Sequence, residues 1–238
     1  MATDLKFQPR RVGSNGFRWL SADAYLFDID GTLLITRDLV HRNALHQAMR
    51  EVYGIEATID GISYHGKTDL GILRAVLTGA GVSHRQFEDS LPAALDVVCR
   101  EVTKRASQIL AEVCTGIPDV LRELQSAGKL IGVASGNLET VGWHKLEAAG
   151  LSDFFTFGSF SDRAEARSVI FCSAVDEAHR RLGHHATVCF VGDTPDDVIA
   201  ARIANAQIVS VCTGTFKAED LSCHSPDVCI SSCAELLR

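Results

Sequence analysis

Two aspartates separated by one residue form the part of this chain best suited to chemistry. Asp28 and Asp30 lie in the segment DIDGT, which directly follows the apolar run AYLF at residues 24–27. An apolar run that ends at a turn residue predicts a buried strand of a parallel sheet, and ligands bind beyond the carboxyl ends of such strands. Residues i and i+2 of an extended chain project to the same side. One carboxylate can therefore attack a substrate atom while the other handles a proton, although these residue types also suit a solvated turn.

A second polar segment follows another predicted strand. The apolar run LIGVA at residues 130–134 leads into Ser135, Gly136 and Asn137, and a helical pattern begins at Leu138. The free N–H groups and the dipole of a helix N-terminus suit a phosphate, and the Ser135 hydroxyl can donate to a phosphoryl oxygen. The simpler alternative is that Ser135 or Asn137 only caps the helix.

Further acids follow a third predicted strand. The run TVCFV at residues 187–191 precedes the segment GDTPDD, which places Asp193, Asp196 and Asp197 at the start of a predicted helix. Acids at a helix N-terminus are common caps. Since the first aspartate pair lies at another strand end, these acids also suit a metal site. Mg²⁺ prefers hard oxygen ligands, one or two of them carboxylates.

These three segments, in this order, resemble the motifs of the haloacid dehalogenase-like hydrolases. The first motif of that family reads Asp-x-Asp-Gly-Thr, the second is a Ser or Thr at a strand end, and the last reads Gly-Asp-x-x-x-Asp. The resemblance covers about residues 21–238. It implies an α/β fold: a doubly wound parallel sheet, or Rossmann-like core, with an inserted all-helical cap domain. Apolar runs predict further core strands at residues 154–157, 207–211 and 227–230.

The resemblance also implies roles for the aspartates. Asp28 would be the nucleophile, and Asp30 the general acid and base. A Mg²⁺ ion would be held by the side chains of Asp28 and Asp193 and by the backbone carbonyl of Asp30. Asp197 would orient a water bound to the metal, because the family spacing falls on Asp197 rather than on Asp196.

The phosphate-binding part of the family pattern is matched less completely. By the resemblance, Ser135 and Gly136 bind the phosphoryl group, and a lysine of a third motif neutralises its charge. No lysine occurs between positions 145 and 217, whereas Arg167 opens a predicted helix where the family lysine would stand. We therefore predict that Arg167 takes this role, with Arg163 as the reserve candidate and a solvated surface arginine as the alternative. An arginine can clamp a phosphate with its planar fork, but it does not replace a compact ammonium neutrally.

The region between the first and second motifs reads as the cap. Apolar residues at helical spacing predict helices at residues 39–52, 70–77 and 91–110. The predicted organisation is an N-terminal extension at residues 1–20, a core at 21–36 and 115–238, and a cap at 37–114. The cap type, the segment GKTD at residues 66–69 and the turn GDTP at 192–195 resemble the phosphoglycolate phosphatase-like branch of the family. Lys67 is a candidate substrate contact if its loop faces the site, and a residue of a simple turn otherwise.

Composition favours a soluble enzyme over a membrane or nucleic-acid-binding protein. The 238 residues carry a net charge of −7, which gives no general attraction to nucleic acid or to an anionic membrane. The mean hydropathy is +0.10, and no apolar stretch approaches the roughly 20 residues that span a bilayer. The eight cysteines include a group at residues 223–233 without the Cys-x-x-Cys spacing of a zinc site. We therefore expect free thiols in a reducing cytoplasm.

These features together predict a Mg²⁺-dependent phosphatase that hydrolyses a small phosphorylated metabolite through an aspartyl phosphate. A phosphomutase needs the same acids and differs in the group that accepts the phosphoryl. Phosphonate cleavage would require a desolvated Lys67 that forms a Schiff base. A non-catalytic family member with a binding or regulatory role is the remaining alternative, supported only by the missing third-motif lysine.

Overall fold

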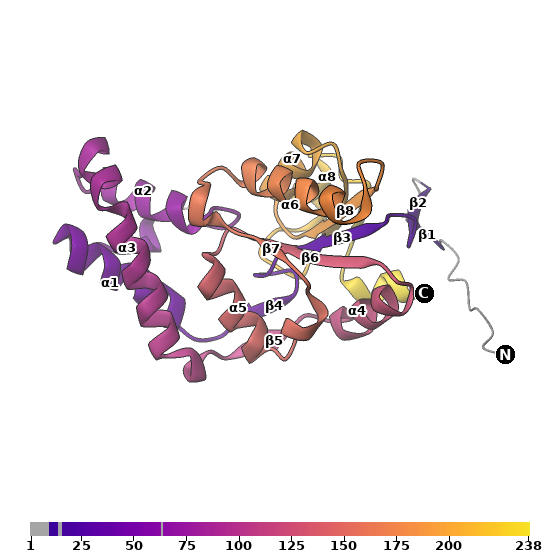
Figure 1. Ribbon diagram of the computed structural model, residues 1–238, viewed down its shortest axis with the longest axis horizontal. Coiled ribbons are helices and arrows are strands. Elements are labelled where there is room, and N and C mark those ends of the chain that lie inside the picture. The colour runs from indigo at the N-terminus through magenta and orange to yellow at the C-terminus, as the bar shows by residue number, and fades with distance from the viewer. Residues whose placement is uncertain (1–9, 14–15, 63) are drawn as a thin grey trace.

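A parallel sheet of six strands forms the centre of the protein (Figure 1). The computed structural model describes residues 10–13, 16–62 and 64–238. In sheet order the strands are β10 (Val228–Ile230), β9 (Gln207–Val211), β8 (Val188–Gly192), β3 (Ala24–Phe27), β6 (Leu130–Ala134) and β7 (Gly158–Ser159). After β3 the chain adds β6 and β7 on one side and then places β8, β9 and β10 on the other. The predicted doubly wound fold is confirmed, and the winding of the sheet reverses at β3.

Helices cover both faces of this sheet, which explains why its strands read as continuous apolar runs. They are α4 (Ile117–Ser126), α5 (Glu139–Ala148), α6 (Arg167–Leu182), α7 (Pro195–Ile203) and α8 (Ala218–Ser222). Tyr25 and Phe27 of β3 lie in the apolar cluster that includes α4, whereas Leu26 lies in the cluster that includes α6 and α7. Figure 1 shows α6 and α7 on one side of the sheet and α4 and α5 on the other. Because side chains of β3 are buried on both faces, the register of β3 against its neighbouring strands is strongly specified.

Three of the helices between β3 and β6 share an apolar cluster that contains none of the sheet strands. They are α1 (Val40–Tyr53), α2 (Asp69–Gly79) and α3 (His84–Lys104). Their buried side chains, such as Leu45, Met49 and Phe87, belong to one cluster, which also includes Leu138 and Val141 at the start of α5. In the part of the chain that the structure describes, no helix is both long and apolar enough to cross a bilayer.

The borders of this helical insert differ from the prediction at two places. Helix α3 begins at His84 rather than at residue 91, because the Ser83 side chain caps it by accepting a hydrogen bond from the Gln86 N–H. The insert also returns to the core through a strand. An antiparallel pair of β4 (Leu34–Thr36) and β5 (Ala111–Val113) joins the two parts. Helix α3 ends at Lys104, so the helix predicted through residue 110 was too long at its C-terminal end.

The strand predicted at residues 154–157 is wrong in position. Ser152–Phe154 form a 3₁₀ turn, and β7 occupies only Gly158 and Ser159. Phe155 and Phe157 are both buried, and they pack in two different apolar clusters. This burial makes the segment as apolar as a strand, and a short apolar run does not by itself identify the backbone conformation.

The predicted N-terminal extension is part of the folded core from residue 10 onward. Strands β1 (Arg10–Val12) and β2 (Phe17–Trp19) pair as an antiparallel hairpin. Trp19 is fully buried, and its indole N–H donates to Glu123 Oε2 at 3.1 Å. Residues 1–9 and 14–15 of the predicted extension lie outside the described residues. Strands of three residues are too short for their alternation to be recognised among polar neighbours.

Candidate active site

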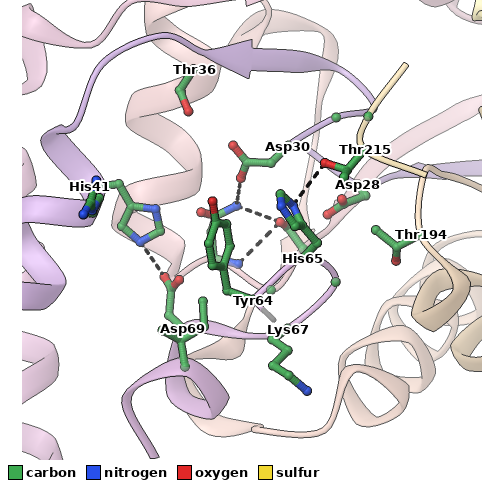
Figure 2. A pocket seen from close by; sticks show the side chains of 18 of the residues that line it. Asp28, Asp30, Thr36, His41, Tyr64, His65, Lys67, Asp69, Thr194 and Thr215 are labelled. Carbon is green, nitrogen blue, oxygen red and sulfur yellow. Dashed lines mark hydrogen bonds and ion pairs between the residues drawn. The ribbon is translucent and has the colours of Figure 1, made fainter. Parts of the chain in front are cut away.

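Three strand ends meet at the point where the sheet reverses its winding. Asp28 follows β3, Ser135 follows β6 and Asp193 follows β8, and β3 lies between the other two strands. All three residues line a cavity of about 530 Å³, whose lining also includes cap residues such as His41 and Tyr64. Figure 2 shows this cavity with side chains of core and cap around it. The predicted site residues are thus brought together at the usual ligand crevice of an α/β sheet.

Three carboxylates form a buried cluster beside this cavity, and two of them, Asp28 and Asp193, line it. Asp28, Asp193 and Asp197 each offer an oxygen within 4.8 Å of the others, and all three residues are at most 4% exposed. Burial raises the pKa of Asp28 and of Asp193, and the neighbouring carboxylates raise both further. A cation at this place would offset the repulsion. Because carboxylate oxygens are the donors that Mg²⁺ prefers, the residues present fit a divalent metal.

Glycines and hydroxyls hold Asp193 in a fixed position. The backbone packs so closely around its carboxylate that a Cβ added at Gly31 or at Gly214 would collide with it. Gly31 also has φ +86, a left-handed conformation that favours glycine. Thr32 donates to Asp193 Oδ1 at 3.1 Å, and Thr213 donates to the Gly31 carbonyl at 2.6 Å. The close backbone at Gly31 and Gly214 and the hydrogen bond from Thr32 therefore restrict the orientation of the Asp193 carboxylate.

Arg167 lies where a cation of the third motif was predicted. Its Nη2 is 2.8 Å from Asp28 Oδ1, and its Nε donates to Asp197 Oδ1 at 2.6 Å. Its Nη1 donates to the Gly66 carbonyl of the cap at 3.1 Å. The side chain is 8% exposed, so the guanidinium neutralises the carboxylates without screening by water. Arg163, the reserve candidate, is exposed and is not in the lining of the cavity.

Asp197 is fully buried, and both of its carboxylate oxygens are occupied. Oδ1 accepts the hydrogen bond from Arg167, and Oδ2 accepts from the Thr194 N–H and hydroxyl at 2.9 and 2.8 Å. The Thr194 hydroxyl accepts in turn from the Asp197 N–H, which makes a capping box at the start of α7. In this structure Asp197 thus caps a helix and orients Arg167. Its role toward a metal-bound water stays a prediction.

Asp30 is held by two residues that the sequence analysis did not assign to the site. Lys145 Nζ donates to Asp30 Oδ1 at 2.9 Å and to Oδ2 at 2.7 Å, and Asn137 Nδ2 donates to Oδ2 at 2.7 Å. Burial alone would raise the pKa of Asp30, but the ammonium of Lys145 and these hydrogen bonds together lower it. Lys145 lies on the buried face of α5 with Val141 and Leu146. The sequence signal that could have indicated this role is a lysine at an apolar position of the helix that follows Ser135.

Ser135 and Gly136 lie between this network and the cap. Ser135 is 1% exposed, and its hydroxyl oxygen accepts from Asn137 Nδ2 at 2.9 Å. The Gly136 carbonyl accepts from the Asp69 N–H of the cap at 2.8 Å. A Cβ at Gly136 would lie 2.8 Å from the carbonyl oxygen of Lys67, so the cap approaches closely here. Both residues line the cavity, as expected for a phosphate-binding turn.

Lys67 lies in a cap loop that reaches the cavity, but its side chain is exposed. Residues 65, 66, 67 and 69 are all in the lining, and His65 Nδ1 lies 3.3 Å from Thr215 Oγ1 of the core. In Figure 2 the Lys67 side chain points away from Asp28 and Asp30. A Schiff-base lysine needs a desolvated amine, which this exposed side chain does not provide. The structure therefore gives no support to the phosphonate alternative.

Asp69 connects the cap to the core, and its replacement by Ala tests that connection. Asp69 Oδ2 accepts from the buried Leu138 N–H at 2.8 Å and lies 3.1 Å from His41 Nε2. In Asp69→Ala this N–H loses its partner. We expect the free energy of unfolding in urea to fall by about 1–3 kcal/mol.

The matched control is Asp60→Ala, which removes another cap aspartate. Asp60 pairs with Arg42, and its side chain is 58% exposed. A surface ion pair of this kind contributes about 0–1 kcal/mol, so this variant should unfold nearly as the wild type does. Equal losses in the two variants would show that the contact with Leu138 adds no stability.

Comparisons with known proteins agree with this geometry. The sequence model of the family described as haloacid dehalogenase-like hydrolase matches residues 25–211. Pyrophosphatase PpaX of Oceanobacillus iheyensis is 23% identical over 221 residues, which are 92% of this chain and 96% of that protein.

Solved structures share the fold. CbbY from Rhodobacter sphaeroides, in complex with phosphate, superposes with a TM-score of 0.67 at 18% identity, over 91% of this chain and 96% of that one. A predicted phosphoglycolate phosphatase from Haemophilus somnus gives a TM-score of 0.66 at 16% identity, with the same coverage of both chains. At these identities the solved structures establish a shared fold.

Proposed function

The chain belongs to the haloacid dehalogenase-like hydrolases, and from this premise we propose that it is a Mg²⁺-dependent phosphatase acting on a small phosphate monoester. One observation supports this most directly. Asp28 ends the central strand with Arg167 at 2.8 Å, beside two further buried carboxylates, and it lines the cavity. A nucleophile needs this combination of a fixed carboxylate, neighbouring positive charge and access to substrate.

In the first step the Asp28 carboxylate attacks phosphorus. A bond forms between Asp28 and the phosphoryl group, the bond to the leaving alcohol breaks, and Asp30, which enters the step in its protonated form, supplies the proton that the alcohol takes up. Arg167 offsets the charge beside Asp28. The Ser135 hydroxyl, at the strand end beside α5, is placed to donate to a phosphoryl oxygen.

In the second step a water hydrolyses the aspartyl phosphate. Asp30 removes a proton from the water as its oxygen attacks phosphorus, and the bond to Asp28 breaks. Inorganic phosphate leaves and the Asp28 carboxylate is restored. Asp30 suits this exchange because its side chain is 41% exposed, whereas the Asp28 side chain, which also lines the cavity, is 6% exposed. Water can therefore reach the base while the nucleophile stays desolvated.

The residues proposed to hold Mg²⁺ are Asp28 and Asp193 through their side chains and Asp30 through its backbone carbonyl. The cluster is fitted for this by its burial and by the mutual repulsion of its carboxylates. The ion would neutralise charge between the nucleophile and the phosphoryl oxygens and help to keep them in line.

The substrate is proposed to be a small phosphorylated metabolite, and the reaction to take place in the cytoplasm, where thiols stay reduced. The cavity of about 530 Å³ is within the usual size of small-molecule sites, and cap residues complete its lining. A lid of this kind excludes water and selects substrate by fit.

We expect phosphate release from a panel of small monoesters to require Mg²⁺ and to stop when a chelator is added. The panel should include pyrophosphate, because the relative PpaX is named a pyrophosphatase. Inorganic phosphate is measured for each compound with Mg²⁺ and with chelator, using Asp28→Asn as the blank. Release above the blank only with Mg²⁺ supports the proposal. Transfer to a sugar phosphate without release would instead identify a phosphomutase. The absence of both release and transfer would favour a non-catalytic role.

A further inference from the structure

Lys145 brings a positive charge into the site from a helix that the phosphatase proposal does not use. The residue is 3% exposed and shares the buried face of α5 with Val141 and Leu146. Lysines are rarely buried unless their charge is paired, because leaving water is costly for an ammonium. A lysine at an apolar position of a core helix therefore needs a partner, and that partner is Asp30.

All the hydrogen bonds of this ammonium go to the Asp30 side of the cavity. Nζ donates to Asp30 Oδ1 at 2.9 Å, to Asp30 Oδ2 at 2.7 Å and to Asn137 Oδ1 at 2.8 Å. An ammonium has three donors, so this set leaves none for a phosphoryl oxygen. Asn137 Nδ2 donates to Asp30 Oδ2 at 2.7 Å and to Ser135 Oγ at 2.9 Å. Lys145 and Asn137 thus hold the Asp30 carboxylate from two directions.

The two buried cations of the site are divided between its two functional aspartates. Arg167 contacts Asp28, and Lys145 contacts Asp30. The Asp30 side chain is 41% exposed while that of Lys145 is 4% exposed, so the ion pair leaves part of the carboxylate accessible. Because both carboxylate oxygens accept hydrogen bonds from these buried side chains, rotation of the Asp30 side chain is restricted.

We propose that Lys145 is a positioning residue that acts through Asp30, and that with Asn137 it fixes the acid that assists departure of the leaving group. The inference rests on the proposed phosphatase function. It assigns to Lys145 a different task from that of Arg167, which contacts Asp28 and not Asp30. The consequence is specific: loss of Lys145 should harm substrates whose leaving group needs a proton and spare those whose leaving group departs unaided.

The test compares kcat/KM for an alkyl phosphate and for p-nitrophenyl phosphate in Lys145→Met. This parameter includes steps only up to leaving-group departure, so the shared hydrolysis of the aspartyl phosphate does not enter. For the alkyl ester we expect a loss of about 10²-fold, the effect of a misplaced catalytic group, and for the aryl ester a loss of less than about tenfold. The control is Lys104→Met, an exposed lysine at the end of α3, which should leave both values unchanged.

A double variant separates action through Asp30 from direct contact with the phosphoryl group. If Lys145 acts through Asp30, the Asp30→Asn/Lys145→Met protein should be no slower than Asp30→Asn alone. Asn137→Ala should show the same selectivity for the alkyl ester in milder form, and it tests the network if Lys145→Met fails to fold. Equal losses on both esters, or a further loss in the double variant, would overturn this inference alone. Wild-type protein that releases phosphate from neither ester would overturn the phosphatase proposal and this inference with it.

Discussion

Replacing Asp28 by Asn is expected to lower phosphate release by more than about 10³-fold, because an amide cannot attack phosphorus as a carboxylate does. Asp28 is the carboxylate at the end of the central strand, and Arg167 lies 2.8 Å from it. Release is measured with Mg²⁺ at saturating substrate. During turnover by the wild-type protein, an acid quench should trap a phosphoryl group on Asp28, which peptide mass spectrometry can locate.

The matched control for this variant is Asp196→Asn. It changes an exposed aspartate that lies between Asp193 and Asp197 in the sequence. It should keep nearly the full rate of the wild type. The fold of Asp28→Asn should survive, because Arg167 keeps its hydrogen bonds to Asp197 and to the Gly66 carbonyl. Substantial release by a folded Asp28→Asn protein would show that another group attacks phosphorus.

The predicted core of the site depended on local patterns, which is why it could be found in the sequence. Asp28, Ser135 and Asp193 each directly follow the strand that positions them, and the carboxyl ends of parallel strands lie at one edge of a sheet. Arg167 was predicted from its place at the start of a helix, and the structure places it against Asp28. In these cases the signal and the structural cause lie within a few residues of each other.

The parts that were missed depend on contacts between distant segments. Lys145 meets Asp30 across a sequence separation of 115 residues, and the Asp69 carboxylate meets the Leu138 N–H across 69. Neither pairing leaves a pattern in its own segment beyond a charged residue at a buried helical position. Asn137 was considered only as a helix cap, although its amide contacts the acid and the serine of the site. Side chains that complete a site from a helix face are therefore harder to predict than those at strand ends.

Replacing Arg167 by Met is expected to lower the free energy of unfolding by about 3–5 kcal/mol, the usual effect of removing one partner of a buried ion pair. The variant would leave Asp28 and Asp197 buried at 4% and 0% exposure with no guanidinium between them. Release of phosphate should fall as well, since the charge beside the nucleophile is lost. Urea unfolding and phosphate release measure the two effects separately.

Lysine at position 167 should recover only part of both properties. Arg167 donates hydrogen bonds to Asp197 and to the Gly66 carbonyl, and its Nη2 lies 2.8 Å from Asp28 Oδ1. A compact ammonium on a flexible stem cannot keep the fixed fork that reaches all three. Arg167→Lys should therefore lie between the wild type and Arg167→Met in stability and in rate, although lysine is the residue of the family pattern.

Arg163→Met and the Mg²⁺ dependence of stability decide whether charge is the cause. Arg163 is exposed, so its replacement should change the free energy of unfolding by no more than about 0.5 kcal/mol. Because a ligand that binds the native state stabilises it, Mg²⁺ at the clustered carboxylates should return part of the stability that Arg167→Met loses. A loss in Arg163→Met as large as that in Arg167→Met would transfer the role to Arg163. Failure of Mg²⁺ to stabilise Arg167→Met would show that these carboxylates do not bind the ion in the variant.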